Sequence, residues 1–259
     1  MLNLFDSYIG IDYSGKGSPS RKYTSIQVFE AGIHTRPSPS NGRGSWSRKD
    51  VYEFLKNKLK QQQNGQIGKM IIGIDHGFSV PHSYFSQHNL SSWNAFLKHF
   101  DHIWGYARKS NLFGNQKGDT FAYSNKNELR LTEKFSSSAK SVFNFDPPVT
   151  VAYSTHTGIP WLYDLRSEFG NLLHFWPFDG LISDETKTVI AEVYPSLFFH
   201  RYRYPIQFEK RDAKDAYAIV SWLQEHDKDG SLNVYFNLPT LKPEEIEIAF
   251  KEGWILGIL

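Results

Sequence analysis

Two short segments of the chain share a pattern in which an apolar strand ends in a carboxylate. Segment 9–12 reads Ile-Gly-Ile-Asp and segment 72–75 repeats it, so the two acids are Asp12 and Asp75. In an open parallel sheet, functional groups gather at the carboxyl ends of the strands, and adjacent strands would bring both acids to one edge. Ionised acids that lie close together repel each other and need a shared proton or a cation. Their oxygen atoms suit Mg²⁺ or Mn²⁺.

Two further acids are candidates for the same site. Glu192 lies within Val-Ile-Ala-Glu-Val-Tyr at 189–194, a run that is apolar on both faces and is typical of a central strand. An unpaired carboxylate would be costly there. Asp215 lies one turn into a helix expected at 212–225. We therefore predict a catalytic, metal-binding site for one or two Mg²⁺ or Mn²⁺ ions, formed by Asp12, Asp75, Glu192 and Asp215.

Each acid also has a structural alternative. An Asp at the end of a strand can simply form a turn, although the duplicated motif makes this less attractive for the first pair. Asp212 and Asp215 have the spacing of a helix N-cap and its third helical residue, where acids favour exposed amides. Glu192 could be neutralised by an arginine or by hydroxyl groups in a structural network.

Three other residues are candidates for contact with a substrate. Ser14 begins a Ser-Gly-Lys-Gly turn whose backbone amides could face an anion, although the turn lacks the spacing of a P-loop. His156 is expected to follow a strand and precede a helix, where it would act as a proton donor, contact phosphate or be a hydrogen-bonded loop histidine. Arg130 could close over a substrate or pair with Glu133.

Composition limits the remaining possibilities. The 259 residues are 40% apolar and 16% aromatic, which is enough for a substantial core. The net charge of +2 argues mildly against a long duplex as ligand, because neutralising many phosphates needs a basic surface. The absence of cysteine excludes disulfides, thiolate zinc sites and cysteine nucleophiles. No signal peptide or membrane anchor is visible at the amino terminus, so we expect a cytoplasmic protein without a membrane partner.

The pattern along the chain indicates an α/β protein. The first half predicts strands at 8–12, 23–30 and 70–75, a loop at 35–47, and a helix that Ser47 caps and that ends near 64. The order strand, helix, strand implies a right-handed parallel crossover. An insertion is expected near 80–148, with one helix at 92–104. The second half predicts strands at 149–153, 172–175 and 189–194. It also predicts a helix at 159–169, with Pro160 near its start and Gly170 just past its end, a helix at 212–225, and a tail at 244–259 that begins as a helix.

Five segments in this order resemble an uncharacterised bacterial family of predicted ribonuclease H-like nucleases. They are Ile9–Asp12, Ile72–Asp75, Ala191–Pro195, Asp212–Ala216 and Glu252–Gly257. The resemblance covers almost the whole chain. It implies one domain with a ribonuclease H-like mixed sheet flanked by helices, in which the first strand neighbours the strand that carries Asp75.

The resemblance also assigns roles to the acids. By analogy, Asp12 would be the central metal ligand, Asp75 the second and Asp215 the acid on a late helix. Glu192 would be either the remaining ligand or a residue that anchors one. The sequence departs from ordinary ribonuclease H because no acid of the first helix clearly matches the usual glutamate, which puts a full two-metal site in doubt.

The predicted function is metal-dependent hydrolysis of phosphodiester bonds in nucleic acid, with Mg²⁺ or Mn²⁺ held by the four acids. One alternative is an ATP-binding phosphotransferase of the sugar-kinase and actin-like superfamily, which shares this core and uses a strand ending in Asp. Such proteins commonly contain two core domains, whereas one core is expected here. A second alternative is a non-catalytic module that binds nucleic acid or protein. The oligomeric state is not predicted.

Overall fold

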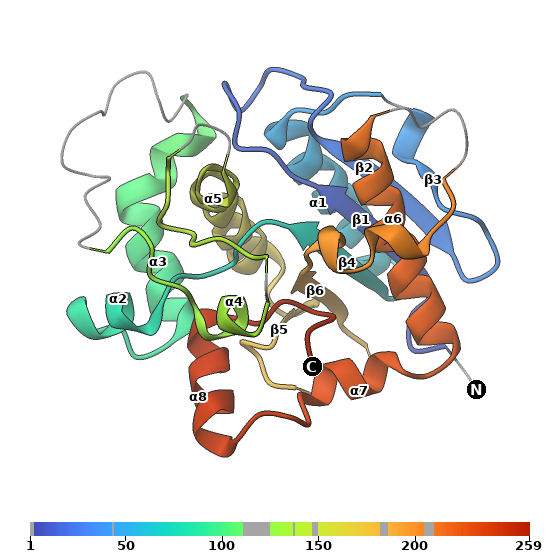
Figure 1. Ribbon diagram of the computed structural model, residues 1–259. Helices are drawn as coiled ribbons and strands as arrows, with labels where there is room; N and C mark the ends of the chain where they lie inside the picture. The colour runs from blue at the N-terminus through green and yellow to red at the C-terminus, as the bar shows by residue number, and fades with distance from the viewer. Residues whose placement is uncertain are drawn as a thin grey trace.

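A computed structural model describes residues 3–42, 44–110, 125–136, 138–146, 150–181, 186–204 and 210–259. One mixed sheet lies between two layers of helices, as expected for the α/β class (Figure 1). Its strands are β1 (Ser7–Asp12), β2 (Gln27–Gly32), β3 (Ser38–Pro39), β4 (Met70–Asp75), β5 (Leu173–Trp176) and β6 (Thr188–Glu192). The six strands lie in the order β3-β2-β1-β4-β6-β5. The pairs β1–β4, β4–β6 and β6–β5 are parallel, whereas β2 is antiparallel to both β1 and β3.

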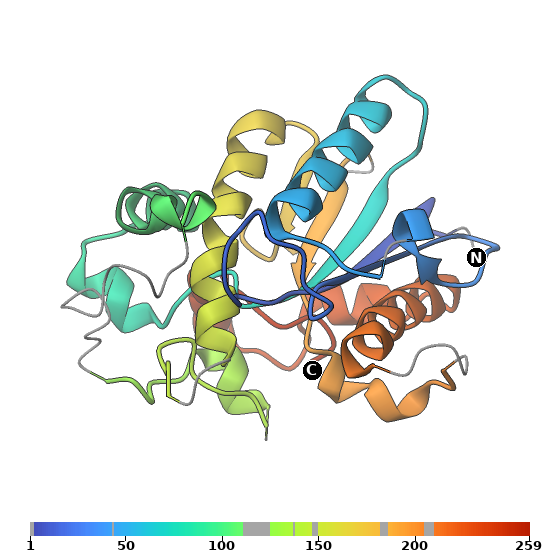
Figure 2. The same ribbon diagram turned by 90° about the horizontal axis from the view of Figure 1, so that it is seen from above.

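Helices cover both faces of the sheet. The α-helices are α1 (Arg48–Gln63), α2 (His82–Gln87), α3 (Trp93–Trp104), α4 (Leu131–Phe135), α5 (Val151–Phe169), α6 (Arg211–Lys228), α7 (Leu232–Asn237) and α8 (Pro243–Glu252). The 3₁₀ helices are η1 (Ser40–Gly42), η2 (Gly105–Arg108), η4 (Pro195–Leu197) and η5 (Phe199–Arg201). Figure 2 shows α1 and α5 on one side of the strands and α6 on the other.

Strand alternation divides the core into two parts, one on each face of the sheet. Ile9 and Ile11 of β1 point to the face covered by α1, α3 and α5, together with Ile72 and Ile74 of β4. Tyr8 and its neighbours on the opposite face pack with α6, α7 and the carboxyl-terminal segment. Residues at alternate positions of a strand therefore face the same helical layer, and this alternation determines which side chains meet at the strand ends.

The glycines of the duplicated motif let α6 approach the sheet closely. Gly10 and Gly73 are partners in the parallel β1–β4 register. A Cβ atom at Gly10 would lie 2.7 Å from the Ala216 carbonyl oxygen, and one at Gly73 would lie 2.8 Å from a methyl carbon of Ile219. Contacts this short exclude any larger residue without movement of α6. The two glycines thus bring the start of α6 toward the strand ends, where the motif places its acids.

Several predicted elements are confirmed. The Ser47 side chain caps α1 by accepting a hydrogen bond from the Asp50 amide at 3.0 Å. The Asp50 carboxylate in turn accepts one from the Ser47 amide, which completes a capping box. The helix α3 follows its own cap, Ser92. The strand around 23–30 is shifted, because β2 begins at Gln27 and ends at Gly32. Within the expected insertion, the structure describes 80–110, 125–136 and 138–146.

The strand predicted at 149–153 is wrong. Residues 151–153 form the first turn of α5, while residue 149 lies outside the described residues. A short apolar run does not by periodicity distinguish a strand from a buried helix segment. Pro160 was expected near a helix start but lies inside α5, where it removes one backbone donor from the helix.

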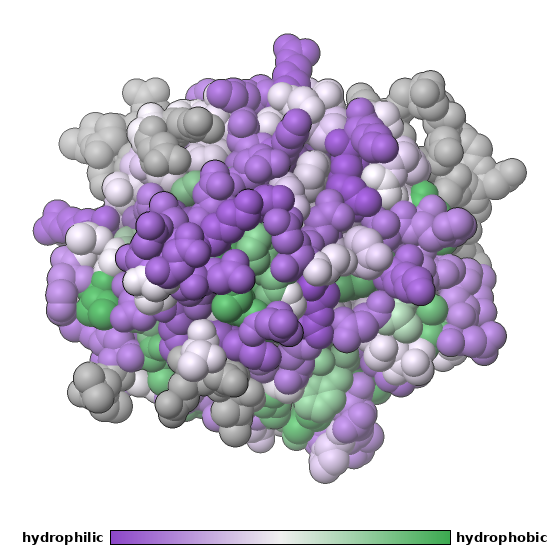
Figure 3. All heavy atoms as spheres, turned by 180° about the vertical axis from the view of Figure 1, so that it is seen from behind, coloured by the Kyte–Doolittle hydropathy of each residue, from purple (hydrophilic) through white to green (hydrophobic). Residues whose placement is uncertain are grey.

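The surface seen in Figure 3 is mainly hydrophilic, and apolar atoms form separate areas among polar ones. No helix in the described part of the chain is long and apolar enough to cross a membrane.

Candidate functional site

Asp12 and Asp75 lie side by side at the carboxyl ends of β1 and β4. The two residues are partners in the parallel register, so their side chains leave the sheet on the same face. Asp12 is 8% exposed and Asp75 is only partly exposed. The duplicated motif therefore produces the adjacent carboxyl pair that the sequence predicts.

Burial and mutual repulsion change the acidity of this pair. Burial raises the pKa of Asp12 well above its usual value, and the negative charges of Asp75 and Asp215 raise it further. For Asp75, burial together with the charges of Asp215 and Glu192 raises the pKa to about 8, although a hydrogen bond with Asp12 opposes the shift. In the absence of a cation, the pair thus retains a proton at neutral pH.

The first turns of α6 add two acids to the same face of the sheet. Asp212 and Asp215 both raise the pKa of Asp12 through their charge, which places them near the pair. Asp215 accepts hydrogen bonds from Arg211 Nε at 2.9 Å on both oxygens. The alternative in which Asp212 is the N-cap is wrong, because α6 begins at Arg211 and Lys210 takes the cap position. Asp215 is therefore close to Asp12 and Asp75 but already has a cationic partner.

Glu192 lies on the opposite face of the sheet. Its register partner on β4 is Ile74 and not Asp75, so its side chain points to the layer formed by α1, α3 and α5. Glu192 therefore does not join the other three acids on the α6 face, although its negative charge raises the pKa of Asp75. The structure favours the alternative that an arginine neutralises this buried acid.

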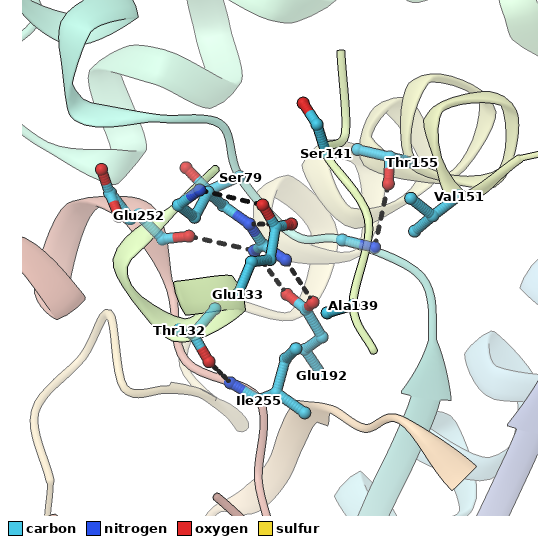
Figure 4. A network of polar contacts seen from close by, with 12 residues as sticks. Ser79, Thr132, Glu133, Ala139, Ser141, Val151, Thr155, Glu192, Glu252 and Ile255 are labelled. Atoms are coloured by element: carbon cyan, nitrogen blue, oxygen red, sulfur yellow. Dashed lines mark hydrogen bonds and ion pairs between the residues drawn. The ribbon is translucent and has the colours of Figure 1, made fainter. Parts of the chain in front are cut away.

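That arginine is Arg130, which bonds to Glu192, Glu133 and Glu252 in a buried polar network. These three acids of the network are labelled in Figure 4. The two terminal nitrogens of Arg130 donate to the two oxygens of Glu192 at 2.5 and 2.8 Å. Its Nε donates to Glu133 at 2.9 Å, and it also reaches the Glu252 carbonyl oxygen at 3.1 Å. The side chains of Arg130 and Glu133 are 1% and 2% exposed. The network anchors the carboxyl-terminal segment to β6, since the Leu256 amide donates to the Glu192 carbonyl oxygen at 2.8 Å.

The charge balance of this network is set by burial and by its ion pairs. Burial lowers the pKa of Arg130, but the charges of Glu192 and Glu133 more than reverse the effect and raise it. Burial raises the pKa of Glu133, against the opposing effect of Arg130. The guanidinium is fully engaged, so Arg130 is a structural residue here. Of the two predicted roles, pairing with Glu133 is confirmed.

A cavity of about 570 Å³ opens at the strand ends beside these groups. Asp75 and Glu192 line it from the sheet, and three further segments form most of the remaining wall, which His76, residues 193–194 and Ile255 complete. These segments are the turn after β1, the region around α4 together with residues 139–140, and the start of α5; the lining residues include Ser14, Lys16, Arg130, Lys140, Tyr153 and Ser154. Ser14 thus lies where the sequence predicts, at the wall of a cavity that also contains Asp75.

His156 does not contribute to the site, and its prediction as a contact residue is wrong. It lies inside α5, is completely buried, and makes a 2.8 Å hydrogen bond through Nδ1 to the Ala152 carbonyl oxygen. The rings of Phe100 and Trp104 pack around it. Burial lowers its pKa to about 3, so it stays neutral at physiological pH.

His76 was missed as a residue of the cavity wall. It directly follows Asp75, is 2% exposed and hydrogen-bonds through Nδ1 to the Gly77 carbonyl oxygen at 2.8 Å. Its ring packs edge-on against Tyr13, which follows Asp12 in the same way, with ring centroids 4.7 Å apart. Burial lowers the pKa of His76 to about 4. The shared position after the two repeated acids is the sequence signal that would have identified it.

The carboxyl oxygens suit a divalent cation, but fewer carboxyl groups meet here than the sequence predicts. Adjacent carboxylates that retain a proton are suited to exchange it for a cation, and hard oxygen donors match Mg²⁺ or Mn²⁺. Among the described residues, however, no group of three or more His, Cys, Asp or Glu side chains is arranged to hold a metal ion. The predicted four-carboxylate centre is therefore reduced to the pair Asp12 and Asp75, with Asp215 nearby.

Comparisons with protein-family models, curated proteins and solved structures found no match. The case for function therefore depends on the site itself.

Proposed function

We propose that the protein is a Mg²⁺- or Mn²⁺-dependent hydrolase of phosphodiester bonds in nucleic acid, with Asp12 and Asp75 at its centre. The observation that carries the proposal is the in-register pairing of these carboxyls at the strand ends, where burial and repulsion keep a proton between them. A protein gains no stability from such a pair. A cation that replaced the proton would relieve the repulsion.

The number of donors is compatible with magnesium. Mg²⁺ usually keeps several water molecules and is bound through one or two carboxylates together with substrate phosphates. Asp12 and Asp75 would hold the ion, whose charge would stabilise the phosphoryl oxygens during hydrolysis. The two carboxylates would fix the position of the ion, while the cavity beside Asp75 would receive the substrate.

The topology agrees with what the family resemblance implies. The strand β1 neighbours β4, and α6 is a late helix that carries Asp215 on the face of the acid pair. We propose on this basis that the sheet is ribonuclease H-like. Asp215 would join the ion only after leaving Arg211, with which it forms a 2.9 Å ion pair. Arg211 is half-exposed, so this pair can open at little cost.

The test is a Mn²⁺ titration by calorimetry of the native protein, Asp12→Asn and Asp75→Asn. Nuclease assays on single-stranded, duplex, hybrid and junction substrates run in parallel. Metal binding and metal-dependent cleavage that are lost in both variants are expected. Asp146→Asn is the matched control, because this side chain is 80% exposed and its ion pair within the described residues is with Lys126 at the surface. Native protein that binds no Mn²⁺ would rule out the proposal.

Two more variants test the reduced ligand set. Glu192→Gln is expected to keep Mn²⁺ binding at a temperature where it remains folded, since Glu192 points to the opposite face. Arg211→Ala is expected to tighten Mn²⁺ binding, because it frees the carboxylate of Asp215. Weaker binding in Arg211→Ala would mean that Asp215 is not a ligand.

A further inference from the structure

The turn after β1 is held by a buried arginine that pairs with no acid in the described part of the chain. Arg48 is 1% exposed and lies in the first turn of α1. It donates to the carbonyl oxygens of Ser14 at 3.3 Å, Lys16 at 2.8 Å and Gly17 at 2.7 Å. We call residues 14–17 the β1 turn. Its conformation is thus fixed from behind by one guanidinium group.

The charge of Arg48 is not neutralised by a carboxylate. No ion pair joins it to any acid of the described residues, and the only groups that oppose the effect of burial on its pKa are Tyr13 and Tyr23. Arginine remains charged in proteins. A buried cation without a counter-ion is costly, so its retention calls for a compensating negative group. Backbone carbonyls supply only part of that compensation.

Two backbone amides of the β1 turn face away from Arg48. In a trans peptide the carbonyl group and the following N–H point in opposite directions. Because the carbonyls of Ser14 and Lys16 point at Arg48, the N–H groups of Gly15 and Gly17 point to the other side. The β1 turn lines the cavity, whereas Arg48 lies behind it. The Lys16 amide between them donates to Ser14 Oγ at 3.3 Å, so two amides of the turn, with a cation behind them, are left to face an anion.

Further features of the cavity wall favour an anion at this point. Lys16 and Lys140 line the cavity with exposed side chains that have no ion pair within the described residues. Two of the acids that line it, Glu133 and Glu192, are already paired with Arg130. Tyr13 also lines the cavity, and its buried hydroxyl has no hydrogen-bond partner in the described part of the chain.

The start of α5 closes this end of the cavity against the β1 turn. A Cβ atom at Gly15 would lie 2.3 Å from the Tyr153 carbonyl, so the turn and the helix are in direct contact. The amino terminus of a 19-residue helix carries partial positive charge. Thr150, Val151 and Ser154 from this end of α5 line the cavity. The helix therefore adds to the field of Arg48 and the two lysines.

We propose that the cavity binds a small phosphorylated molecule whose phosphate group lies against the β1 turn. Its volume of about 570 Å³ falls within the range of small-molecule pockets and suits a ligand of nucleotide size. Asp75 lines the same cavity, so a bond next to the bound phosphate would be close to the acid pair. The choice of phosphate among anions rests on the proposed function. The anion site itself depends only on the β1 turn, Arg48 and the lysines.

The test measures binding without metal, so that it is independent of the acid pair. Inorganic phosphate, adenosine 5′-monophosphate, ribose 5-phosphate and a single-stranded oligonucleotide are titrated by calorimetry in the presence of EDTA. The proteins are native, Lys16→Ala, the double variant Lys16→Ala with Lys140→Ala, and Arg48→Lys. Lys49→Ala is the matched control, since Lys49 is an exposed neighbour of Arg48 that does not line the cavity.

We expect phosphate and both monophosphates to bind the native protein and Lys49→Ala equally. Each lysine removed should weaken binding about tenfold, the effect of losing one charge-assisted hydrogen bond. Arg48→Lys should also weaken binding while circular dichroism remains native; if this variant does not fold, the lysine variants alone decide. The stronger of the two monophosphates identifies the base or the sugar as the second contact.

Three results would overturn the inference. The first is no phosphate binding to native protein, and the second is binding that is equal in the double lysine variant and in Lys49→Ala. The third is binding of the oligonucleotide alone. Each of these leaves Mn²⁺ binding by Asp12 and Asp75 untouched, whereas loss of Mn²⁺ binding with phosphate binding intact would refute only the proposed function.

Discussion

Replacing Asp75 by asparagine is expected to stabilise the metal-free protein at pH 8 but not at pH 4. Burial and the neighbouring charges raise the pKa of Asp75 to about 8 in the folded protein, against a usual value of 3.8. Between these values the unfolded chain has lost a proton that the folded protein keeps. The free energy of unfolding of the native protein therefore falls as the pH rises through this range. Asparagine carries no charge and removes this loss.

The upper limit of the effect follows from the size of the shift. The difference between 3.8 and about 8 corresponds to at most about 6 kcal/mol, at about 1.4 kcal/mol for each pKa unit. Asp75 is partly exposed, so solvent screens its charge and reduces this value. We expect the free energy of unfolding of Asp75→Asn to exceed that of the native protein by about 2 to 3 kcal/mol at pH 8, and we expect the difference to vanish near pH 4.

The assay is chemical denaturation in EDTA at intervals from pH 4 to pH 8, followed by tryptophan fluorescence. Asp146→Asn, which changes an acid that is 80% exposed, should follow the native curve throughout. Addition of Mn²⁺ at pH 8 should stabilise the native protein and leave Asp75→Asn unchanged, because binding to the folded state alone raises stability. A constant difference between Asp75→Asn and native protein at all pH values would show that the pKa of Asp75 is not raised in the folded protein, and the reasoning would fail.

Three other changes test the surroundings of the pair. Glu192→Gln should lower the free energy of unfolding by about 3 kcal/mol in thermal or chemical denaturation, because it removes one of the two carboxylates that pair with the buried Arg130. No loss of stability would contradict the pairing of Glu192 with Arg130. Gly15→Ala should weaken phosphate binding in calorimetry, since its Cβ would displace the Tyr153 carbonyl 2.3 Å away. His156→Gln should lower the melting temperature and leave the affinity for phosphate unchanged, and a change in that affinity would contradict its place in the core.

The features that could be predicted from the sequence are those encoded within one element. The duplicated Ile-Gly-Ile-Asp segments contain the strand, the glycine that admits α6 and the acid at the strand end, so β1 and β4 follow from local pattern alone. The cap at Ser47 could likewise be predicted locally, because it is formed by residues within a four-residue segment. The adjacency of β1 and β4 was implied only by the family resemblance. The parallel crossover expected between the strand at 23–30 and the strand at 70–75 is wrong, because β2 runs antiparallel to β1 and β4 pairs with β1 instead.

Partners from distant segments could not be predicted in the same way. Arg48 occupies the first turn of an amphipathic helix, where a basic residue usually faces solvent, and only the path of the β1 turn buries it. Arg130 and Glu192 are separated by 62 residues, and no local sequence pattern around either residue predicts that the other is its partner. His156 was placed wrongly because the helix that contains it begins before the point that its proline suggested.

Glu192 shows most directly that predicting a strand and its acid correctly does not yet predict a site, because the face on which the side chain lies must also be known. Successive residues of a strand point to opposite faces, so a shift of one residue in register moves every side chain to the other layer. With Ile74 as its partner, Glu192 faces the layer of α1 and α5; with Asp75 as its partner, it would have joined the acid pair. Burial penalises an isolated carboxylate equally in both positions. The register is therefore fixed by the partners that each face supplies, and Arg130 supplies the only guanidinium that bonds to Glu192 among the described residues.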